Sequence, residues 1–380
     1  MGRRFCFRAG AFWALLVAAI IATIGPVEAQ ASIASIPVGA QPEGVAINPS
    51  DNRVYVTNNG AGSVSVIDGL TNGVVATVSV GTRPFGVAVN STTNRVYVAN
   101  QGGNSVSVVD GTTDKVVATI PVSQNPTEVA VNPTTNSVYV GNGLGNSVSV
   151  IDGATDKVVA TIPFASGPFG LAVNPTTNRL YVITTGFQGK LSVLDTTTNQ
   201  VVATVPSGSN SALVAVNPTS NHYYFTNTMI GNVSVIDGVT NQVITTIPTG
   251  SPPVGTLGIA VNPTTNRIFA ASFSQGKNNL VILDGSTNRV VATIPLTGSA
   301  NQLAVNPTTG RVYVAIGQGN SVAVVQDTVG VNQPSPSPAA QATGLAVPPQ
   351  LPRTGGLSLA LLAVIGTSLL GLGLGARRRR

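Results

Sequence analysis

The feature that most constrains this chain is a unit of about 42 residues that occurs seven times. An Asn closes the first apolar segment of each unit, and successive Asn residues lie 42, 42, 42, 43, 45 and 44 positions apart. These residues are Asn48, Asn90, Asn132, Asn174, Asn217, Asn262 and Asn306. The units are rich in Val with period-2 alternation and lack helical periodicity, which predicts β-strands. The array therefore predicts a repeat architecture in which neighbouring units bury one another's apolar faces.

Each unit divides into four short apolar segments separated by turn residues. In the first unit these segments cover residues 45–48, 54–57, 63–68 and 74–80. The separators are of the Asn-Pro-Thr-Thr-Asn, Gly/Asn-rich and Asp-Gly-x-Thr-Asn kinds, all of which favour turns. Seven four-stranded units predict an all-β, seven-bladed β-propeller over residues 32–327.

The two ends of the array predict how the ring closes. Six units finish with a Val-Val-Ala-Thr-type segment, but the seventh runs from residues 321–326 into Pro/Ser-rich sequence. The missing strand is present ahead of the first unit, at residues 32–38 (SIASIPV). We therefore expect this N-terminal strand to complete the last blade and cover its open edge.

One small residue is present at the same place in every first strand. Blades converge toward the axis of a propeller, so a side chain that points at the next blade has little room there. A larger residue should overpack the site at a cost of roughly 1–3 kcal/mol. These residues are Ala46, Ala88, Ala130, Ala172, Ala215, Ala260 and Ala304.

The second strands carry a short motif. The sequence YVTN at residues 55–58 is repeated as YVAN at 97–100 and as YVGN at 139–142. It resembles the YVTN-type β-propeller repeat of bacterial and archaeal surface proteins. The resemblance implies the broad propeller group that includes quinoprotein amine dehydrogenase subunits, sugar-lactone hydrolases and antibiotic lyases. These proteins share no single activity, so the fold by itself does not transfer a function.

The N-terminus has the features of a secretory signal peptide over residues 1–29. Arg3, Arg4 and Arg8 precede an apolar run at residues 9–24, and the segment ends in Val-Glu-Ala, a small-residue cleavage site. The only cysteine, Cys6, lies in this segment. The mature chain is therefore expected to be exported and to contain no disulfide.

The C-terminus begins with a Pro/Ser/Ala-rich linker at residues 328–350. A tail at residues 351–380 follows, in which an apolar segment at 357–375 is long enough to cross a bilayer as a helix and four terminal arginines favour a cytoplasmic end. The tail resembles the LPxTG cell-wall sorting signal of Gram-positive-type bacteria. The matching residues are Leu351, Pro352, Thr354 and Gly355, with Arg353 at the free position.

This resemblance implies that a sortase cleaves between Thr354 and Gly355 and transfers the Thr354 carboxyl group to an amine of peptidoglycan. The alternative is a permanent single-pass membrane anchor. Both interpretations predict that the propeller is displayed outside the cell on a tether.

The charge distribution argues against nucleic acid as a partner. The whole chain carries a net charge of +6, but residues 30–354 contain twelve Lys and Arg and twelve Asp and Glu. The excess positive charge lies in the two terminal segments, where it serves targeting rather than phosphate binding.

The loops of the predicted propeller differ in variability between its two faces. Loops from first to second and from third to fourth strands barely change, and they lie on one face, which we call the constant face. The remaining loops vary and lie on the opposite face, the variable face. Variable loops on a rigid scaffold usually carry recognition. The candidate ligand-binding residues there are Glu43, Arg83, Phe85, Glu128, Phe169, Phe187, Lys190, Met229, Phe273 and Lys277.

We expect these residues to form an aromatic and charged patch for a glycan, protein or small-molecule ligand, with Phe85 and Phe169 near the mouth of the central channel. The alternative is drift of the loops, with the Phe side chains filling gaps between blades. On the constant face, six Asp residues that end third strands should accept backbone N–H bonds within their turns. Five Arg residues that begin second strands should pair with this ring of Asp residues, although together the two rings could bind an acidic partner.

The sequence contains no catalytic constellation. The sole histidine, His222, replaces an Arg of the repeat on the constant face, and Glu43 and Glu128 are the only carboxylates of the variable face. No phosphate loop, zinc-type spacing or Cys nucleophile is present. The sequence therefore favours a non-enzymatic binding or adhesion module without metal or cofactor. A structural surface-layer component without a specific ligand and a lactonase- or lyase-like hydrolase are the alternatives.

Overall fold

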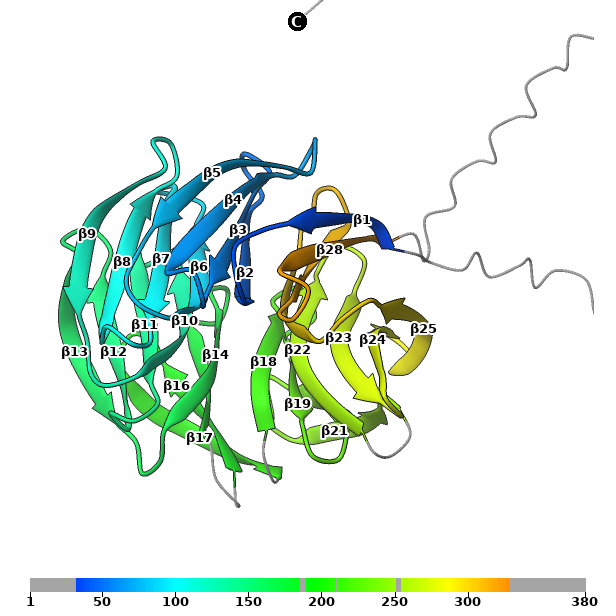
Figure 1. Ribbon diagram of the computed structural model, residues 1–380. Coiled ribbons are helices and arrows are strands. Elements are labelled where there is room, and N and C mark those ends of the chain that lie inside the picture. Colours follow the sequence, from blue (N-terminus) through cyan, green and yellow to red (C-terminus); the bar gives the residue numbers. More distant parts are fainter. Residues whose placement is uncertain (1–31, 185–188, 209–210, 251–253, 328–380) are drawn as a thin grey trace, which may run out of the picture. The chain divides into compact units, whose positions relative to one another are not determined.

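The computed structural model describes residues 32–184, 189–208, 211–250 and 254–327. These residues form seven four-stranded antiparallel sheets arranged as blades around a ring (Figure 1). The predicted all-β, seven-bladed propeller is thereby confirmed. The predicted signal peptide, linker and sorting tail, with Leu351, Pro352, Arg353, Thr354 and Gly355, lie outside the described residues. Within the described ranges, no helix has the length and apolar character to cross a membrane.

The strands follow the repeat closely. Blade 1 contains β2 (Pro42–Asn48), β3 (Arg53–Asn58), β4 (Ser63–Asp68) and β5 (Gly73–Ser79). Blade 2 contains β6 (Pro84–Asn90), β7 (Arg95–Asn100), β8 (Ser105–Asp110) and β9 (Lys115–Pro121). Blade 3 contains β10 (Pro126–Asn132), β11 (Ser137–Asn142), β12 (Ser147–Asp152) and β13 (Lys157–Pro163). Blade 4 contains β14 (Pro168–Asn174), β15 (Arg179–Thr184), β16 (Gly189–Asp195) and β17 (Gln200–Gly208). Blade 5 contains β18 (Ser211–Asn217), β19 (His222–Asn227), β20 (Asn232–Asp237) and β21 (Val243–Pro248). Blade 6 contains β22 (Val254–Asn262), β23 (Arg267–Ser274), β24 (Lys277–Asp284) and β25 (Arg289–Leu296).

Blade 7 is assembled from both ends of the array, as the sequence predicts. It contains β26 (Ala300–Val305), β27 (Arg311–Ile316), β28 (Ser321–Gln326) and the N-terminal β1 (Ser32–Pro37). β1 pairs antiparallel with β28, so the sheet has the order β1-β28-β27-β26 (Figure 1). The first strand of the chain thus covers an edge that β28 would otherwise leave open.

The apolar core is divided into seven clusters, one between each pair of neighbouring blades. Side chains alternate between the two faces of each sheet: Tyr55 packs toward blade 2, and the adjacent Val54 and Val56 pack toward blade 7. The Ala residues that recur in the first strands pack against these clusters. Ala46 lies between blades 1 and 2, and Ala88 lies between blades 2 and 3. Every blade therefore depends on both of its neighbours for burial.

A ring of side-chain hydrogen bonds links each blade to the next on the constant face. The Asn that ends each first strand donates through Nδ2 to an acceptor in the next blade, as Asn48 does to Asn94 at 2.9 Å and Asn306 to Asn52 at 2.6 Å. The remaining pairs are Asn90–Asn136, Asn132–Asn178, Asn174–Asn221, Asn217–Asn266 and Asn262–Asp327. The Oδ1 atom of the donor accepts the backbone N–H two residues later, which forms the turn.

The six acceptor Asn residues all occupy the left-handed backbone region, which Asn tolerates better than most residues. In the seventh unit this position is Gly310, which has a φ of +68° and no side chain. The Asp327 carboxylate instead accepts from Asn262 at 3.4 Å. The ring is thereby complete around all seven blades.

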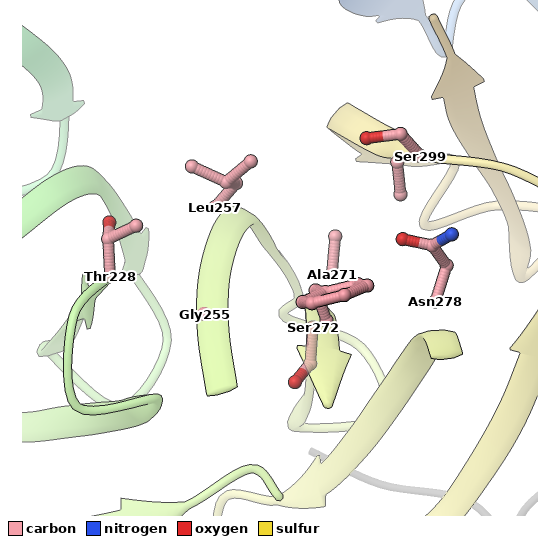
Figure 2. Close-up of a pocket in the computed structure, with 9 residues that line it drawn as sticks. Thr228, Gly255, Leu257, Ala271, Ser272, Asn278 and Ser299 are labelled. Carbon is pink, nitrogen blue, oxygen red and sulfur yellow. The ribbon is translucent and has the colours of Figure 1, made fainter. Parts of the chain in front are cut away.

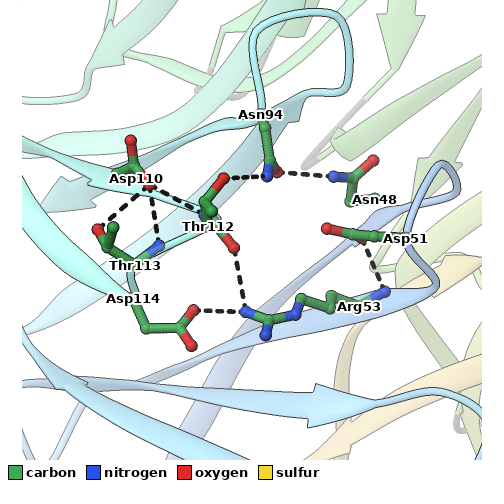
Figure 3. A network of polar contacts seen from close by, with 9 residues as sticks. Asn48, Asp51, Arg53, Asn94, Asp110, Thr112, Thr113 and Asp114 are labelled. Carbon is green, nitrogen blue, oxygen red and sulfur yellow. Dashed lines mark hydrogen bonds and ion pairs between the residues drawn. The ribbon is translucent and has the colours of Figure 1, made fainter.

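The Asp residues that end third strands serve their turns, as predicted. Asp110 accepts the backbone N–H groups of Thr112 and Thr113, each at 2.9 Å (Figure 3). These hydrogen bonds, led by the one from Thr113, hold the pKa of the Asp110 carboxyl below its ordinary value. The same turn hydrogen bonds form at Asp68, Asp152, Asp195, Asp237 and Asp284.

The predicted pairing of Arg residues with this Asp ring is correct in two blades and wrong in three. Arg179 and Arg267 pair with Asp195 and Asp284 of their own blades. Arg53 instead reaches the next blade and pairs with Asp114 at 2.7 Å (Figure 3), and Arg95 likewise pairs with Asp156. The reason is that only the turns of blades 2 and 3 have a second Asp as their fifth residue.

Arg311, the third exception, has an Asn at the corresponding position of the next turn. Its Nη1 atom donates to the backbone carbonyl groups of Gly69 and Leu70 in blade 1. The constant face therefore satisfies its own charged groups largely within the ring.

The outermost strands share a bulge. Each of the six fourth strands has one extra residue opposite the third strand, for example Val75 between the pairs Val66–Ala76 and Ile67–Val74. β1 has the equivalent bulge at Ile33 against β28. Bulges interrupt the hydrogen-bond ladder and discourage pairing of exposed edges with another chain.

The closure by β1 makes a testable prediction about two Ile residues of one strand. Ile36 is 3% exposed and packs between blades 7 and 1, whereas the bulged Ile33 is 51% exposed. We expect Ile36→Ala to lower the free energy of unfolding by about 2–5 kcal/mol. Ile33→Ala, as the matched control, should change it by no more than about 0.5 kcal/mol. Urea unfolding of both variants measures this, and equal effects would contradict the closure.

Candidate ligand-binding face

The starts of the first strands surround the central channel on the variable face. Four blades have a glycine at the third position of this segment, because the next blade approaches closely there. A Cβ atom on Gly86 would lie 2.5 Å from the Thr127 carbonyl oxygen, and one on Gly258 would lie 2.3 Å from that of Asn301. Blades 3, 5 and 7 have Glu128, Leu213 and Gln302 at this position instead. At this position, therefore, only these three blades carry a side chain toward the channel.

Glu128 and Gln302 connect blades that are not neighbours. The Nε2 atom of Gln302 donates to Oε2 of Glu128 at 2.7 Å. Since blade 3 and blade 7 are separated by other blades in both directions around the ring, this bond crosses the channel. Glu128 is 8% exposed, and burial raises the pKa of its carboxyl group to about 8, against the opposing effect of the hydrogen bond from Gln302. At neutral pH the side chain is thus mostly uncharged.

A small hollow lies at the mouth of the channel. Its volume is about 60 Å³, and its lining comes from six of the seven blades. The lining residues are Glu43, Phe85, Phe169, Ala212, Leu213, Leu257, Asn301 and Gln302. The rings of Phe85 and Phe169 meet edge to face, with their centroids 5.9 Å apart. Residues far apart in the sequence are thus brought together because all of them begin first strands.

Glu43 is the ionisable residue of this hollow. The side chain is partly buried, and burial raises the pKa of its carboxyl group to about 7. In the part of the chain that the structure describes, this carboxyl group forms no hydrogen bond or ion pair. It differs in this respect from Glu128, whose carboxyl group is bonded to Gln302.

A second, larger hollow lies beside the first. Its volume is about 240 Å³. Figure 2 shows some of its lining residues, among them Thr228, Leu257, Asn278 and Ser299. Leu257 contributes to both hollows. The Oγ1 atom of Thr228 donates to the backbone oxygen of Thr256 at 3.1 Å, which ties a loop of blade 5 to blade 6.

Apolar side chains are exposed around this second hollow. Leu257 and Phe273, which both line it, are 43% and 45% exposed. Met229 and Ile230, which directly follow Thr228, are 63% and 61% exposed. This part of the variable face therefore presents apolar surface to the solvent.

The structure brings together some of the predicted candidates and separates others. Glu43, Phe85 and Phe169 line one hollow, and Glu128 is connected to that hollow through Gln302. Arg83, Lys190 and Lys277 are exposed and line neither hollow. Phe187 lies outside the described residues. The predicted mixture of aromatic and positively charged groups is thus not a single patch, since the three cations lie on different blades and none lines the hollow that contains the two Phe rings.

Sequence reasoning missed Leu257, Asn301 and Gln302. None of them stands out by residue type, and Leu257 follows an inserted loop. An alignment of the second and third positions of all first strands would have identified them, because these positions converge on the channel in every blade.

The remaining residues that could act in catalysis or bind a metal ion are dispersed. His222 begins β19 on the constant face, in register with Asn217 and Asp237. Within the described ranges, no three or more His, Cys, Asp or Glu side chains are grouped in a way that could hold a metal ion.

The two raised carboxyl pKa values predict how stability depends on pH. In the unfolded chain Glu128 titrates near 4.5, whereas in the folded protein its pKa is about 8. The folded state therefore binds the proton more tightly, and the resulting stability is complete below pH 4.5 and is lost as the pH rises to 8. The loss is on the order of 1 kcal/mol per pH unit.

Glu128→Gln cannot titrate and keeps an amide partner for Gln302, so it should flatten most of this slope. Glu43→Gln, as a comparison, should remove only the smaller part that ends near pH 7. The free energy of unfolding in urea, measured from pH 5 to 9, reports both effects. A Glu128→Gln slope equal to that of the wild type would contradict the burial of this carboxyl group.

Comparison with known proteins supports the fold. The NHL repeat family matches residues 40–67, which cover most of the first three strands of blade 1. A search of curated proteins gives no match. Hydrazine synthase of Kuenenia stuttgartiensis is a similar solved structure, with a TM-score of 0.69 and 21% sequence identity over 76% of this chain and 96% of that chain. At this identity the likeness shows a shared fold, so the chain is a seven-bladed β-propeller with one unit similar to an NHL repeat.

Proposed function

We propose that this protein is an exported, surface-anchored interaction module whose variable face binds a macromolecule. The observation that carries the proposal is the form of this face. The channel is crossed by the Glu128–Gln302 bond, and the two hollows near it measure about 60 and 240 Å³. A third hollow, of about 500 Å³, is a shallow depression between the loops of blades 7 and 1. Pockets for small ligands usually measure about 300–1,000 Å³ and enclose most of the ligand, whereas the one hollow of that size is open to solvent. Shallow hollows with exposed apolar side chains fit protruding groups of a larger partner better.

We infer a non-enzymatic role from the two carboxyl groups of the face. Glu128 is buried and hydrogen-bonded to Gln302, and Glu43 has no acid, base or positioning group bonded to it among the described residues. General acid–base catalysis needs convergent groups that hold one another in place. This favours binding over lactonase- or lyase-like hydrolysis.

The outer strands bear on the alternative of a structural surface-layer component. Lateral assembly through sheet edges would need regular outer strands, but all seven outer strands are interrupted by a bulge. The bulges therefore support a propeller that acts as a separate module.

Display at the cell surface is supported by the sequence of the two ends. Residues 1–29 have the pattern of a signal peptide, and residues 351–380 combine Leu-Pro-Arg-Thr-Gly, an apolar span and four arginines in the order of a sorting signal. Attachment to peptidoglycan by a sortase would use the carboxyl group of Thr354. The linker at residues 328–350 would hold the propeller away from its attachment point.

The interaction proposal predicts that the variable face controls adhesion. Cells that display the Phe85→Ala/Phe169→Ala variant should lose at least about tenfold in adhesion and in glycan- or protein-array binding. The Leu70→Ala/Val239→Ala variant is the matched control, because both side chains are exposed in constant-face turns, at 76% and 79%. Surface amounts are compared with an antibody. Equal adhesion by both variants would refute the proposal.

The anchoring proposal predicts the mature ends of the protein. Wall fragments released by a muralytic enzyme should contain a chain that begins after Ala29 and ends at Thr354, linked to a peptidoglycan amine. Mass spectrometry measures both ends. A Thr354→Ala variant should stay in the membrane fraction, and a mature wild-type chain that still ends at Arg380 would show a membrane anchor instead.

A further inference from the structure

We propose that the hollow at the channel mouth binds the primary ammonium group of a lysine side chain on a partner protein, with Glu43 as its counter-ion and Phe85 and Phe169 as its walls. This inference rests on the proposed function, since it names the chemical group that the variable face recognises. Four features of the hollow support it.

The first feature is an unpaired negative group. Glu43 is the only ionisable residue that lines the hollow, and within the described chain its carboxyl group has no hydrogen bond or ion pair. Removing a carboxylate from water without a partner is unfavourable, so the group is neutralised or takes up a cation. Burial raises the pKa of Glu43 to about 7, and a bound cation would return the group to its ionised form.

The second feature is the aromatic wall. Phe85 and Phe169 are in contact, and their ring centroids lie 5.9 Å apart. An ammonium group within about 6 Å of a ring face is attracted by the ring quadrupole. The methylene groups of a lysine can pack on the same rings while its charge reaches the carboxylate.

The third feature is the orientation of two amides. The Nδ2 atom of Asn301 donates to the backbone oxygen of Pro42 at 2.9 Å, and Nε2 of Gln302 donates to Glu128 at 2.7 Å. One N–H of each amide is thus used within the protein, and among the described residues no hydrogen bond occupies either side-chain oxygen, so both oxygen atoms can accept. An ammonium group carries three donors and no acceptor, so it can bond to these two oxygen atoms and to the Glu43 carboxylate.

The fourth feature is size. A hollow of about 60 Å³ admits the end of a side chain rather than a complete ligand. A compact ammonium group suits it better than the planar guanidinium group of arginine, which needs a wider fork of acceptors. A lysine that projects from a partner protein meets both conditions, because the rest of the partner can lie on the surrounding apolar surface.

The test uses the full-length protein in detergent and immobilised peptides that differ at one residue. The peptides are acetyl-Gly-Ser-Gly-X-Gly-Ser-Gly-amide, in which X is lysine, norleucine, Nε-acetyllysine or arginine. We expect the lysine peptide to bind about tenfold more tightly than each of the other three. Glu43→Gln should abolish this preference, and Glu43→Asp, which keeps the charge, should retain it. Asp51→Asn is the matched control, because it removes one exposed carboxylate on the constant face.

A norleucine peptide that binds as tightly as the lysine peptide, or a Glu43→Gln variant that keeps the lysine preference, would overturn the proposal. Thermal unfolding of Glu43→Gln verifies that the variant is folded. Adhesion of cells separates this outcome from the proposed function. If Glu43→Gln leaves adhesion unchanged while Phe85→Ala/Phe169→Ala abolishes it, the face binds a partner without recognising an ammonium group. If neither variant affects adhesion, the proposed function itself is refuted.

Discussion

The ring depends on a hydrogen bond that is repeated from blade to blade. At each step an Asn that ends a first strand fixes its own turn through Oδ1 and contacts the next blade through Nδ2, as Asn90 does with Asn136 at 2.7 Å. A buried amide is satisfied only if both its donor and its acceptor find partners, and each bond contributes about 1 kcal/mol. Because the partner always belongs to the following blade, and Asn306 of blade 7 bonds to Asn52 of blade 1, the bonds join all seven blades in a closed circle.

This constraint explains why one face of the propeller is so uniform. Its turns need Asn for blade-to-blade bonds, Asn, Asp or Gly for the left-handed backbone, and Asp to accept two backbone N–H groups. Its Arg residues bind neighbouring carboxylates or carbonyl groups. Bonds within the ring therefore account for the uniformity of this face, and no external ligand is needed to explain it. The opposite face also has left-handed Asn and Gly residues, but side-chain hydrogen bonds such as that of Asn100 with Ser105 stay within one blade, and the rest of its loops can vary.

The channel shows how seven similar units can form a site that occurs only once in the molecule. Glycine at the third position of the first strand lets blades 1, 2, 4 and 6 approach their neighbours, whereas Glu128, Leu213 and Gln302 place side chains into the channel from the other three. One polar bond then crosses the axis, and Glu43, Phe85 and Phe169 gather above it. A site with one partly buried, unpaired carboxyl group thus arises where the blades differ in sequence, and binding energy and selectivity can be placed there without weakening the ring.

The sequence by itself determined the number of blades, the order of their strands and the closure by residues 32–37, because period-2 alternation, turn residues and a displaced seventh strand are local patterns. It also indicated Phe85 and Phe169 at the channel. Only the tertiary structure decided that Glu128 reaches Gln302, that Arg53 bypasses Asp68 for Asp114, and that Leu257 and Asn301 join the same hollow. These contacts join residues on different blades, and their partners depend on side-chain length and on how the ring curves, which no pattern along the chain records.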